Sequence, residues 1–188
     1  PVLLHGKEQA SYDWAMTLPD GSMAELMDPT TKTPEFLPDV PGSYLLTVTD
    51  LEAMTPVEIE VYAGTWRGVI VDQDMDGEPI SDPNCTGCHG QLSRGNDFDK
   101  WKTTGHAHIF STQLDTSTHY GTGCFACHTV GFDPGVDNKG FDDQADYQDF
   151  LDSGLLNNPG DHWTTMLEDY PPTAQLGHIQ CETCHGPQ

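Results

Sequence analysis

The pentad Cys-x-x-Cys-His occurs three times in this 188-residue chain and uses every cysteine. The three copies contain Cys85, Cys88, His89, Cys124, Cys127, His128, Cys181, Cys184 and His185. A disulfide scaffold gives no reason for a histidine at the same offset in each copy. Zinc ribbons do use Cys-x-x-Cys pairs, but they need two pairs per metal, so one of three pairs would lack a partner. Both alternatives explain less of the pattern than a cofactor that takes one pentad each.

The pentad is the attachment signature of haem c. Two thiols add across the two vinyl groups of one porphyrin, and the two intervening residues set the separation of the sulfur atoms. The histidine that follows then lies under the ring, where its imidazole can bind the iron. The sequence therefore predicts three covalently bound c-type haems, each held by one cysteine pair and by the adjoining histidine.

The composition agrees with a fold that is built around such groups. Only 36% of the residues are apolar, while the chain has 19 glycines and 14 prolines. Such a composition is typical of a loop-rich chain that has difficulty offsetting its conformational entropy. A covalently attached haem supplies a large apolar surface that loops can surround. We therefore expect residues 67–188 to form a loop-rich, mostly short-helical trihaem cytochrome c domain.

Six histidines remain for the second axial position of the irons: His5, His106, His108, His119, His162 and His178. His119 and His178 each lie a few residues before a cysteine pair, which ties them to a haem. His106 and His108 lie in WKTTGHAHIF, and their spacing points them to different faces of a short helix, so that both should not serve one iron. We predict His106, His119 and His178 as the distal ligands.

The other three histidines are alternatives for this role. His108 has a competing interpretation as a solvated or propionate-binding side chain. His162, in GDHWTT, is a weaker candidate. His5 is interpreted as a surface histidine or as a ligand that is donated to a neighbouring subunit. Methionine is the competing ligand type, but none of the six methionines lies close to a pentad in the way the histidines do.

Residues 1–66 contain no cysteine and have the pattern of short strands. The segments YDWAMTL, AELMD, TPEFLPD, SYLLTVTD and PVEIEVYAG are β-rich, and turn sequences such as PDGS and DVPG separate them. This regular spacing predicts a small antiparallel sandwich. Trp14 and Tyr44 are expected in its core, and the sandwich is expected to act as a spacer or an assembly surface.

An acidic run follows, with Asp72, Asp74 and Asp76 before Gly77. Its spacing resembles the first half of an EF-hand calcium loop, but the twelfth position is Pro83 and not the bidentate glutamate. A solvated acidic linker is therefore favoured over a calcium site.

The net charge of −23, from 30 acidic and 7 basic residues, makes nucleic acid and anionic membrane surfaces poor partners. It suits a basic redox partner or a saline environment, and the sequence does not decide between them. No apolar stretch approaches the roughly eighteen residues of a membrane span, so none is predicted.

Several segments together resemble a known family. CTGCH, WKTTGHAHIF, CFACHTVGF, NKGFDD and IQCETCHGP resemble the haem region of multihaem c-type cytochromes of the cytochrome c554-like group. YDWAMTLPDGSMAEL and FLPDVPGSYLLTVTD resemble the PKD-like, immunoglobulin-type sandwich that precedes the haems in some bacterial members. The resemblance favours His106 over His108 as a distal ligand. Members of the group continue past CHGP with a further histidine that is often a ligand, so the resemblance implies a longer polypeptide. It also leaves open whether one haem takes its sixth ligand from this chain, from the further sequence or from a neighbouring molecule.

These features predict an electron-transfer protein and not an enzyme. Three bis-histidine, low-spin haems would pass electrons to redox partner proteins or extracellular acceptors, at the cell surface, outside the cell or in the periplasm. Self-association into a filament with shared haem ligands is an extension of this hypothesis. A haem enzyme of the nitrogen-oxide reductase or hydroxylamine oxidase type, with one open iron, is the alternative. A binding module that its haems only stabilise is the third class.

Overall fold

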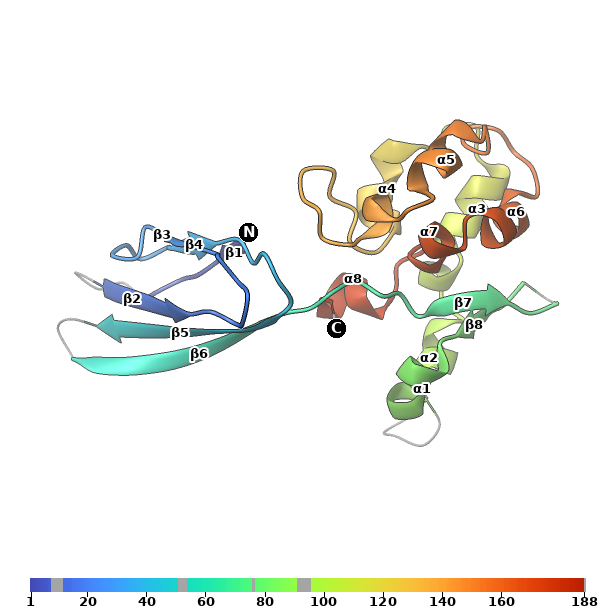
Figure 1. The fold of residues 1–188 in the computed structure, drawn as a ribbon. Coiled ribbons are helices and arrows are strands. Elements are labelled where there is room, and N and C mark those ends of the chain that lie inside the picture. Colours follow the sequence, from blue (N-terminus) through green and yellow to red (C-terminus); the bar gives the residue numbers. More distant parts are fainter. Residues whose placement is uncertain (8–11, 51–53, 76, 91–95, 188) are drawn as a thin grey trace. The chain divides into compact units, whose positions relative to one another are not determined.

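The computed structural model describes residues 1–7, 12–50, 54–75, 77–90 and 96–187. The chain divides into two compact units, Pro1–Gly64 and Thr65–Gln188 (Figure 1). The division lies two residues before the boundary that the sequence suggests after residue 66. Trp66 explains the difference, because its ring packs against the core of the second unit and so belongs to that unit.

The first unit contains two three-stranded antiparallel sheets among its described residues. The first sheet has the order β1 (Val2–Leu3), β4 (Glu35–Phe36), β3 (Leu26–Met27), and the second has the order β2 (Tyr12–Thr17), β5 (Gly42–Asp50), β6 (Thr55–Ala63). Each of the five segments that the sequence predicts as extended contains one of these strands. The regular pairing of β5 with β6 runs over nine residue pairs and forms the longest ladder of the unit.

Alternating side chains from both sheets form one core in this unit. In β2 the side chains alternate between buried and exposed, as a half-buried strand requires. The buried residues are Leu4, Tyr12, Trp14, Phe36, Tyr44 and Leu46. Trp14 and Tyr44 are therefore core aromatics, as predicted, and the Trp14 indole also donates a hydrogen bond to the Thr31 carbonyl over 3.1 Å.

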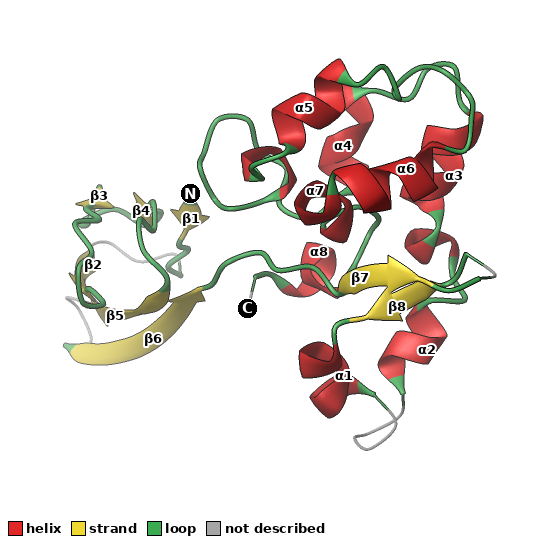
Figure 2. Ribbon diagram, turned by 45° about the vertical axis from the view of Figure 1, so that its right-hand side comes forward, coloured by secondary structure: helices red, strands yellow, loops and turns green. Residues whose placement is uncertain are grey.

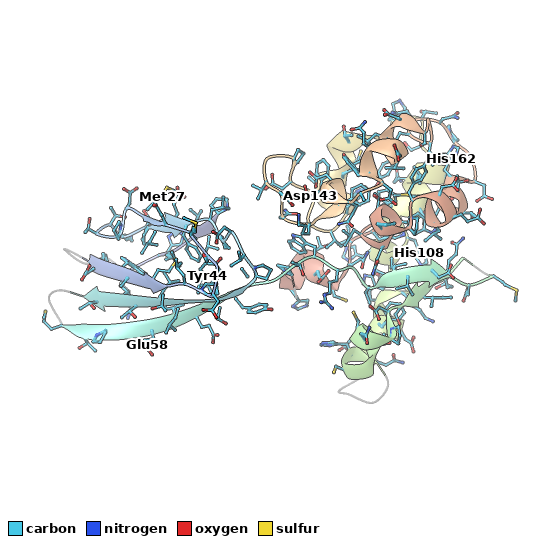
Figure 3. All side chains as sticks on the ribbon, viewed as in Figure 1. Met27, Tyr44, Glu58, His108, Asp143 and His162 are labelled. Carbon is cyan, nitrogen blue, oxygen red and sulfur yellow. The ribbon has the colours of Figure 1, made fainter. Side chains whose placement is uncertain are left out.

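The hydroxyl of Tyr44, a residue near the start of β5 that Figure 3 labels, forms hydrogen bonds with the backbone of the preceding loop. It accepts from the backbone N–H groups of Asp39 and Val40, each over 3.2 Å, and can donate to the Val40 carbonyl over 2.9 Å. A tyrosine that bonds back to the backbone a few residues upstream resembles the tyrosine corner of immunoglobulin-type sandwiches. That fold has about seven strands, and the described part of this unit has six, so the immunoglobulin-type topology stays a prediction.

The second unit is built from short helices around one hairpin. The helices are α1 (Pro83–His89), α2 (Asp97–Trp101), α3 (Ile109–Thr116), α4 (Thr122–His128), α5 (Tyr147–Asp152), α6 (His162–Asp169), α7 (Pro171–Gln175) and α8 (Cys181–His185), with 3₁₀ turns η1 (Gly105–Ala107) and η2 (Phe141–Asp143). The hairpin of β7 (Ile70–Gln73) and β8 (Pro79–Ser81) lies between α1 and α2 on one side and α3 to α7 on the other (Figure 2). Within the described ranges, no helix has the length and apolar character that a membrane crossing needs.

An aromatic cluster forms the main core of this unit. Phe110, Phe125, Phe141 and Phe150 are fully buried, and their rings contact one another in tilted or edge-on arrangements. Asp115 at the end of α3 joins two helices of the cluster, because its carboxylate accepts from the first two backbone N–H groups of α6, both over 2.8 Å. A side chain from outside the helix thus satisfies N–H groups that have no partner within it.

The acidic run that the sequence suggests as a solvated linker is instead the turn of the β7–β8 hairpin. Asp74 closes this turn, since its backbone N–H donates to the Glu78 carbonyl over 2.9 Å and its carboxylate accepts from the Glu78 N–H over 3.0 Å. An EF-hand loop joins two helices, whereas this run joins two strands. Pro83 begins helix α1. Asp76 lies outside the described residues.

We expect Tyr44→Phe to lower the free energy of unfolding of the first unit by about 1–3 kcal/mol, because the two backbone N–H groups lose a buried acceptor. Urea denaturation measures this change. Tyr62→Phe is the matched control, since Tyr62 on β6 is 61% exposed and should change stability by less than about 0.5 kcal/mol. Equal effects of the two substitutions would contradict a structural role for the Tyr44 hydroxyl.

Candidate functional site

A cavity of about 620 Å³ in the second unit is lined by the first and the third pentad. The pentad residues in its wall are Cys85, Thr86, Cys88 and His89 of the first pentad and Cys181, Glu182 and His185 of the third. Val69 and Phe98 add apolar side chains to the wall, and polar and charged residues complete it: Arg67, Asp82, Asn84, Asp97 and Gln180. The volume lies in the range of small-molecule and cofactor sites. The fold therefore brings together two motifs that are far apart in the sequence.

Helical geometry explains how each pentad presents its side chains. Residues that are three and four apart on a helix share one face, so both cysteines and the histidine of a pentad lie on the same side. Helix α1 begins with Pro83 and is capped by Asp82, whose carboxylate accepts from the Asn84 N–H over 2.8 Å. Helix α8 begins with a capping box between Gln180 and Thr183.

Three consecutive backbone N–H groups in the cavity wall form hydrogen bonds with the third pentad and with the residue before it. Arg67 and Gly68 donate to Oε2 of Glu182 over 3.1 and 2.8 Å, and Val69 donates to Oε1 of Gln180. Glu182 lies between the two cysteines of its pentad and is only 8% exposed. Its second oxygen, Oε1, is buried without a hydrogen-bond partner among the described residues.

Two cysteines of the cavity have raised pKa values, which favours their neutral thiol form. All six cysteines of the chain are free. Burial raises the pKa of Cys85, and the nearby charges of Asp82 and Glu182 raise it further. Burial also raises the pKa of Cys181. Thiolates are the form that binds zinc, and among the described residues no group of three or more metal-ligating side chains is gathered at one point.

The second pentad lies apart from this cavity and is anchored in the aromatic core. Cys124 packs against the core, Phe125 is buried inside it, and Cys127 is exposed. Nδ1 of His128 is 3.1 Å from the Tyr120 hydroxyl, and the two rings stack. Burial lowers the pKa of His128 and raises that of Tyr120. A partner on Nδ1 leaves Nε2 of His128 for a metal, which is the usual arrangement of a ligating histidine.

His178 is buried in the core and does not line the cavity. Its ring is edge-on to Trp163 at 4.7 Å between centroids, and its Nδ1 accepts from the Phe110 backbone N–H over 3.3 Å. Burial, with a smaller effect of His108 and His128, lowers the pKa of His178 to about 3. The neutral ring therefore carries its proton on Nε2, and binding of iron through Nε2 requires the ring to give up this tautomer and the Phe110 bond.

The other two predicted distal ligands are exposed. His106 lies in η1, and its carbonyl accepts from the Ile179 N–H over 3.2 Å, on the segment that leads into the third pentad. His119 has Nδ1 2.9 Å from the Thr118 hydroxyl. It directly precedes Tyr120, the residue that contacts His128, so that His119 lies beside the second pentad.

The three alternative histidines differ in their surroundings. Nε2 of His108 is 2.7 Å from the Lys102 carbonyl and 3.9 Å from the Glu78 carboxylate (Figure 3). His162 begins α6, and its Nε2 is buried without a partner among the described residues. His5 follows β1 in the first unit and is exposed. The Lys102 contact engages Nε2 of His108, the nitrogen that an iron would need.

Sequence reasoning missed the residues that fasten the cavity. Glu182 occupies a spacer position of the pentad, where the haem signature places no requirement, so nothing in the motif singles it out. Gln180 had no clear signal either, because the usual capping-box sequence has Ser or Thr first and Glu or Gln three residues later, whereas here Gln180 comes first and Thr183 follows. Tyr120 lies next to a predicted ligand, but its contact with His128 depends on the turn before α4.

We expect Gly68→Ala to destabilise the second unit by at least about 1 kcal/mol. Gly68 has a positive φ of 68°, and an added Cβ would lie 2.3 Å from the Gln175 carbonyl oxygen. Thermal unfolding measures the loss. Gly105→Ala is the control, because no described atom lies within 4 Å of its added Cβ, and equal stability losses in both variants would contradict this steric explanation.

Comparison with known proteins places this chain in no family. No protein-family model, no curated protein and no solved structure matches it. The resemblance to multihaem cytochromes therefore remains a prediction from the motifs, and the function has to be argued from the cysteine pairs, the imidazoles and the cavity themselves.

Proposed function

We propose that this chain is an electron-transfer protein that carries three covalently attached c-type haems. The observation that supports it best is the cavity that the first and third pentads line together. Both cysteines of the first pentad and Cys181 of the third line this one space, although they lie far apart in the sequence, and this supports neighbouring attachment sites.

The side chains at the cavity fit the chemistry of haem c. Thioether formation needs two reduced thiols at a fixed separation and an adjoining imidazole. Cys85, Cys88 and His89 meet this requirement on one face of α1, and the third pentad does so on α8. The cavity also has the size of a cofactor site, and Val69 and Phe98 give part of its wall an apolar surface.

The second pentad fits the same group in a different setting. Phe125 and Cys124 fasten α4 to the aromatic core, and Tyr120 holds the ring of His128 through Nδ1. The orientation of a metal-bound imidazole is set by the partner of its second nitrogen. Tyr120 is therefore proposed to orient His128 for the second haem.

Bound haem supplies a one-electron iron couple, and an iron with imidazole on both sides reorganises little on reduction. The chain's own contribution is to position the axial histidines and to keep the attachment points close to one another. We propose His106, His119 and His178 as distal ligands. His106 and His119 are exposed and available, whereas His178 must leave its contact with Phe110.

The partners and the location are proposed from chemistry. Haem c is attached after export, which favours the cell surface or the extracellular space, with the periplasm as the alternative. The net charge of −23 favours a basic redox protein or an extracellular acceptor over nucleic acid. Assembly of many copies into a filament with shared ligands is a further part of this proposal.

Production in a host that matures c-type cytochromes should give a coloured protein whose mass exceeds that of the polypeptide by three haem groups. The double variant Cys124→Ala, Cys127→Ala should carry two, because the second pentad has lost both thiols. Mass spectrometry under denaturing conditions measures this number. Thr122→Ala, at an exposed position on the same helix, is the control and should keep three. A colourless protein, or one with the bare polypeptide mass, would rule out the proposal.

Replacing each proposed distal ligand by glutamine should convert one of the three irons from low-spin to high-spin. The variants are His106→Gln, His119→Gln and His178→Gln, and electron paramagnetic resonance of the ferric protein counts the high-spin irons. His5→Gln tests the remaining alternative: all irons should stay low-spin if His5 is the exposed surface residue of the first unit, whereas a high-spin iron would identify it as the ligand donated to a neighbouring subunit.

Two results would correct the ligand assignment. A fully low-spin spectrum for one of the three variants would move that iron's ligand to His108 or His162. A high-spin, cyanide-binding iron in the unsubstituted protein would favour the haem-enzyme alternative, because turnover needs an open coordination position.

A further inference from the structure

Glu182 is a buried acidic residue inside the third pentad, and the proposed function does not use it. Its position follows from the fold: Oε2 accepts from the backbone N–H groups of Arg67 and Gly68, and the side chain forms part of the cavity wall. The inference that follows rests on the proposed function, because it concerns the groups that the cavity would hold.

The charge of Glu182 is not compensated by an ion pair within the described residues. Its Oε1 is buried without a partner there, and its two hydrogen bonds come from neutral backbone groups. A charge in such a low-dielectric setting acts on its neighbours more strongly than a solvated one. The charge of Glu182 contributes to the raised pKa values of both Cys85 and Cys181, so it acts on both attachment sites of the cavity.

We propose that Glu182 is a tuning residue that lowers the reduction potentials of the two haems attached at the first and third pentads. Ferric haem carries one positive charge more than ferrous haem, and a fixed negative charge beside it stabilises the oxidised form. The second haem, which is attached at α4 outside this cavity, is not affected in the same way. The spacer position of the third pentad thus sets the redox properties of a pair and not of a single group.

Arg67 provides the opposite charge at the same cavity. Its side chain is in the cavity wall, and it lowers the pKa of Cys85 where Glu182 raises it. Its hydrogen bond to Glu182 comes from the backbone N–H and not from the guanidinium. Substitution of the Arg67 side chain therefore changes the charge without removing that bond.

The experiment compares two substitutions of Glu182 in the haem-loaded protein by spectropotentiometric titration, resolved into three one-electron steps. Glu182→Gln keeps an oxygen acceptor for the Arg67 and Gly68 N–H groups and removes the charge, so two of the three potentials should rise. Glu182→Asp keeps the charge and shortens the side chain, so the potentials should stay near those of the unsubstituted protein. Glu168→Gln, at an exposed site on α6, is the control for net charge and should move none.

The outcomes separate tuning by charge from a purely structural role. A structural role predicts the reverse order, with the aspartate variant shifted and the glutamine variant unchanged, and that result would overturn the proposal. So would an unchanged titration of Glu182→Gln, or an equal shift of all three steps.

If Glu182→Gln does not bind haem, a substitution of Arg67 provides a second test of the proposal. Arg67→Gln should lower the same two potentials, and a rise or no change would overturn the proposal. Lys139→Gln, an exposed lysine paired with Asp137, is its control. Haem number, from mass, is measured first in every variant. Absence of haem from the unsubstituted protein refutes the proposed function, whereas three haems with unmoved potentials refute only the role of Glu182.

Discussion

The hydrogen bonds from Arg67, Gly68 and Val69 to Glu182 and Gln180 determine how the second unit is organised around its cavity. They join the segment that leads into the β7–β8 hairpin to the helix that carries the third pentad. Because the hairpin leads directly into α1, the same bonds bring the first pentad to the third. The Trp101 indole of α2, which donates to the Ile179 carbonyl over 2.8 Å, adds a further bond between the part of the chain that follows α1 and the segment before α8.

The core of this unit differs in part from the core that its composition predicts. A low apolar content predicts that haems replace side chains in the core. Around the second pentad, however, Phe110, Phe125 and Phe141 form a closed aromatic cluster of their own. The first and third pentads differ, since they face a cavity with a small apolar cluster of Val69, Ile70 and Phe98 beside it. The unit therefore combines a side-chain core with a cavity that two pentads line.

The sequence predicts what depends on local pattern and fails where distant contacts decide. The strands around Trp14 and Tyr44 follow from alternation and turn residues, which act within a few positions. The prediction of haem attachment rests on the spacing within each pentad, which can be read without tertiary structure. The acidic run ending at Gly77 was interpreted as a linker because its hairpin depends on pairing between β7 and β8. The division after Gly64 likewise depends on distant contacts, because the Trp66 ring packs on residues far along the chain.

The predicted distal histidines show the same difference between what local sequence predicts and what distant contacts decide. His119 and His178 lie near a pentad in the sequence, and this proximity identifies them as candidates. Whether each ring is exposed or packed depends on the fold around it, and His178 is held by Phe110 and Trp163 from two other segments. No local pattern contains this information. Proximity in sequence therefore selects candidates but does not establish which nitrogen is free.

The residues between the two cysteines give the three pentads different structural roles. Thr86 bonds to Ser81 and to the Asp82 carbonyl, Phe125 fills the aromatic core, and Glu182 anchors a distant backbone segment. The haem c signature places no requirement on these positions, whereas the fold gives each of them a different set of contacts. A chimaera that exchanged CFACH and CETCH would retain every thiol and imidazole, yet it would bury a carboxylate among phenylalanines and leave the cavity wall unfastened.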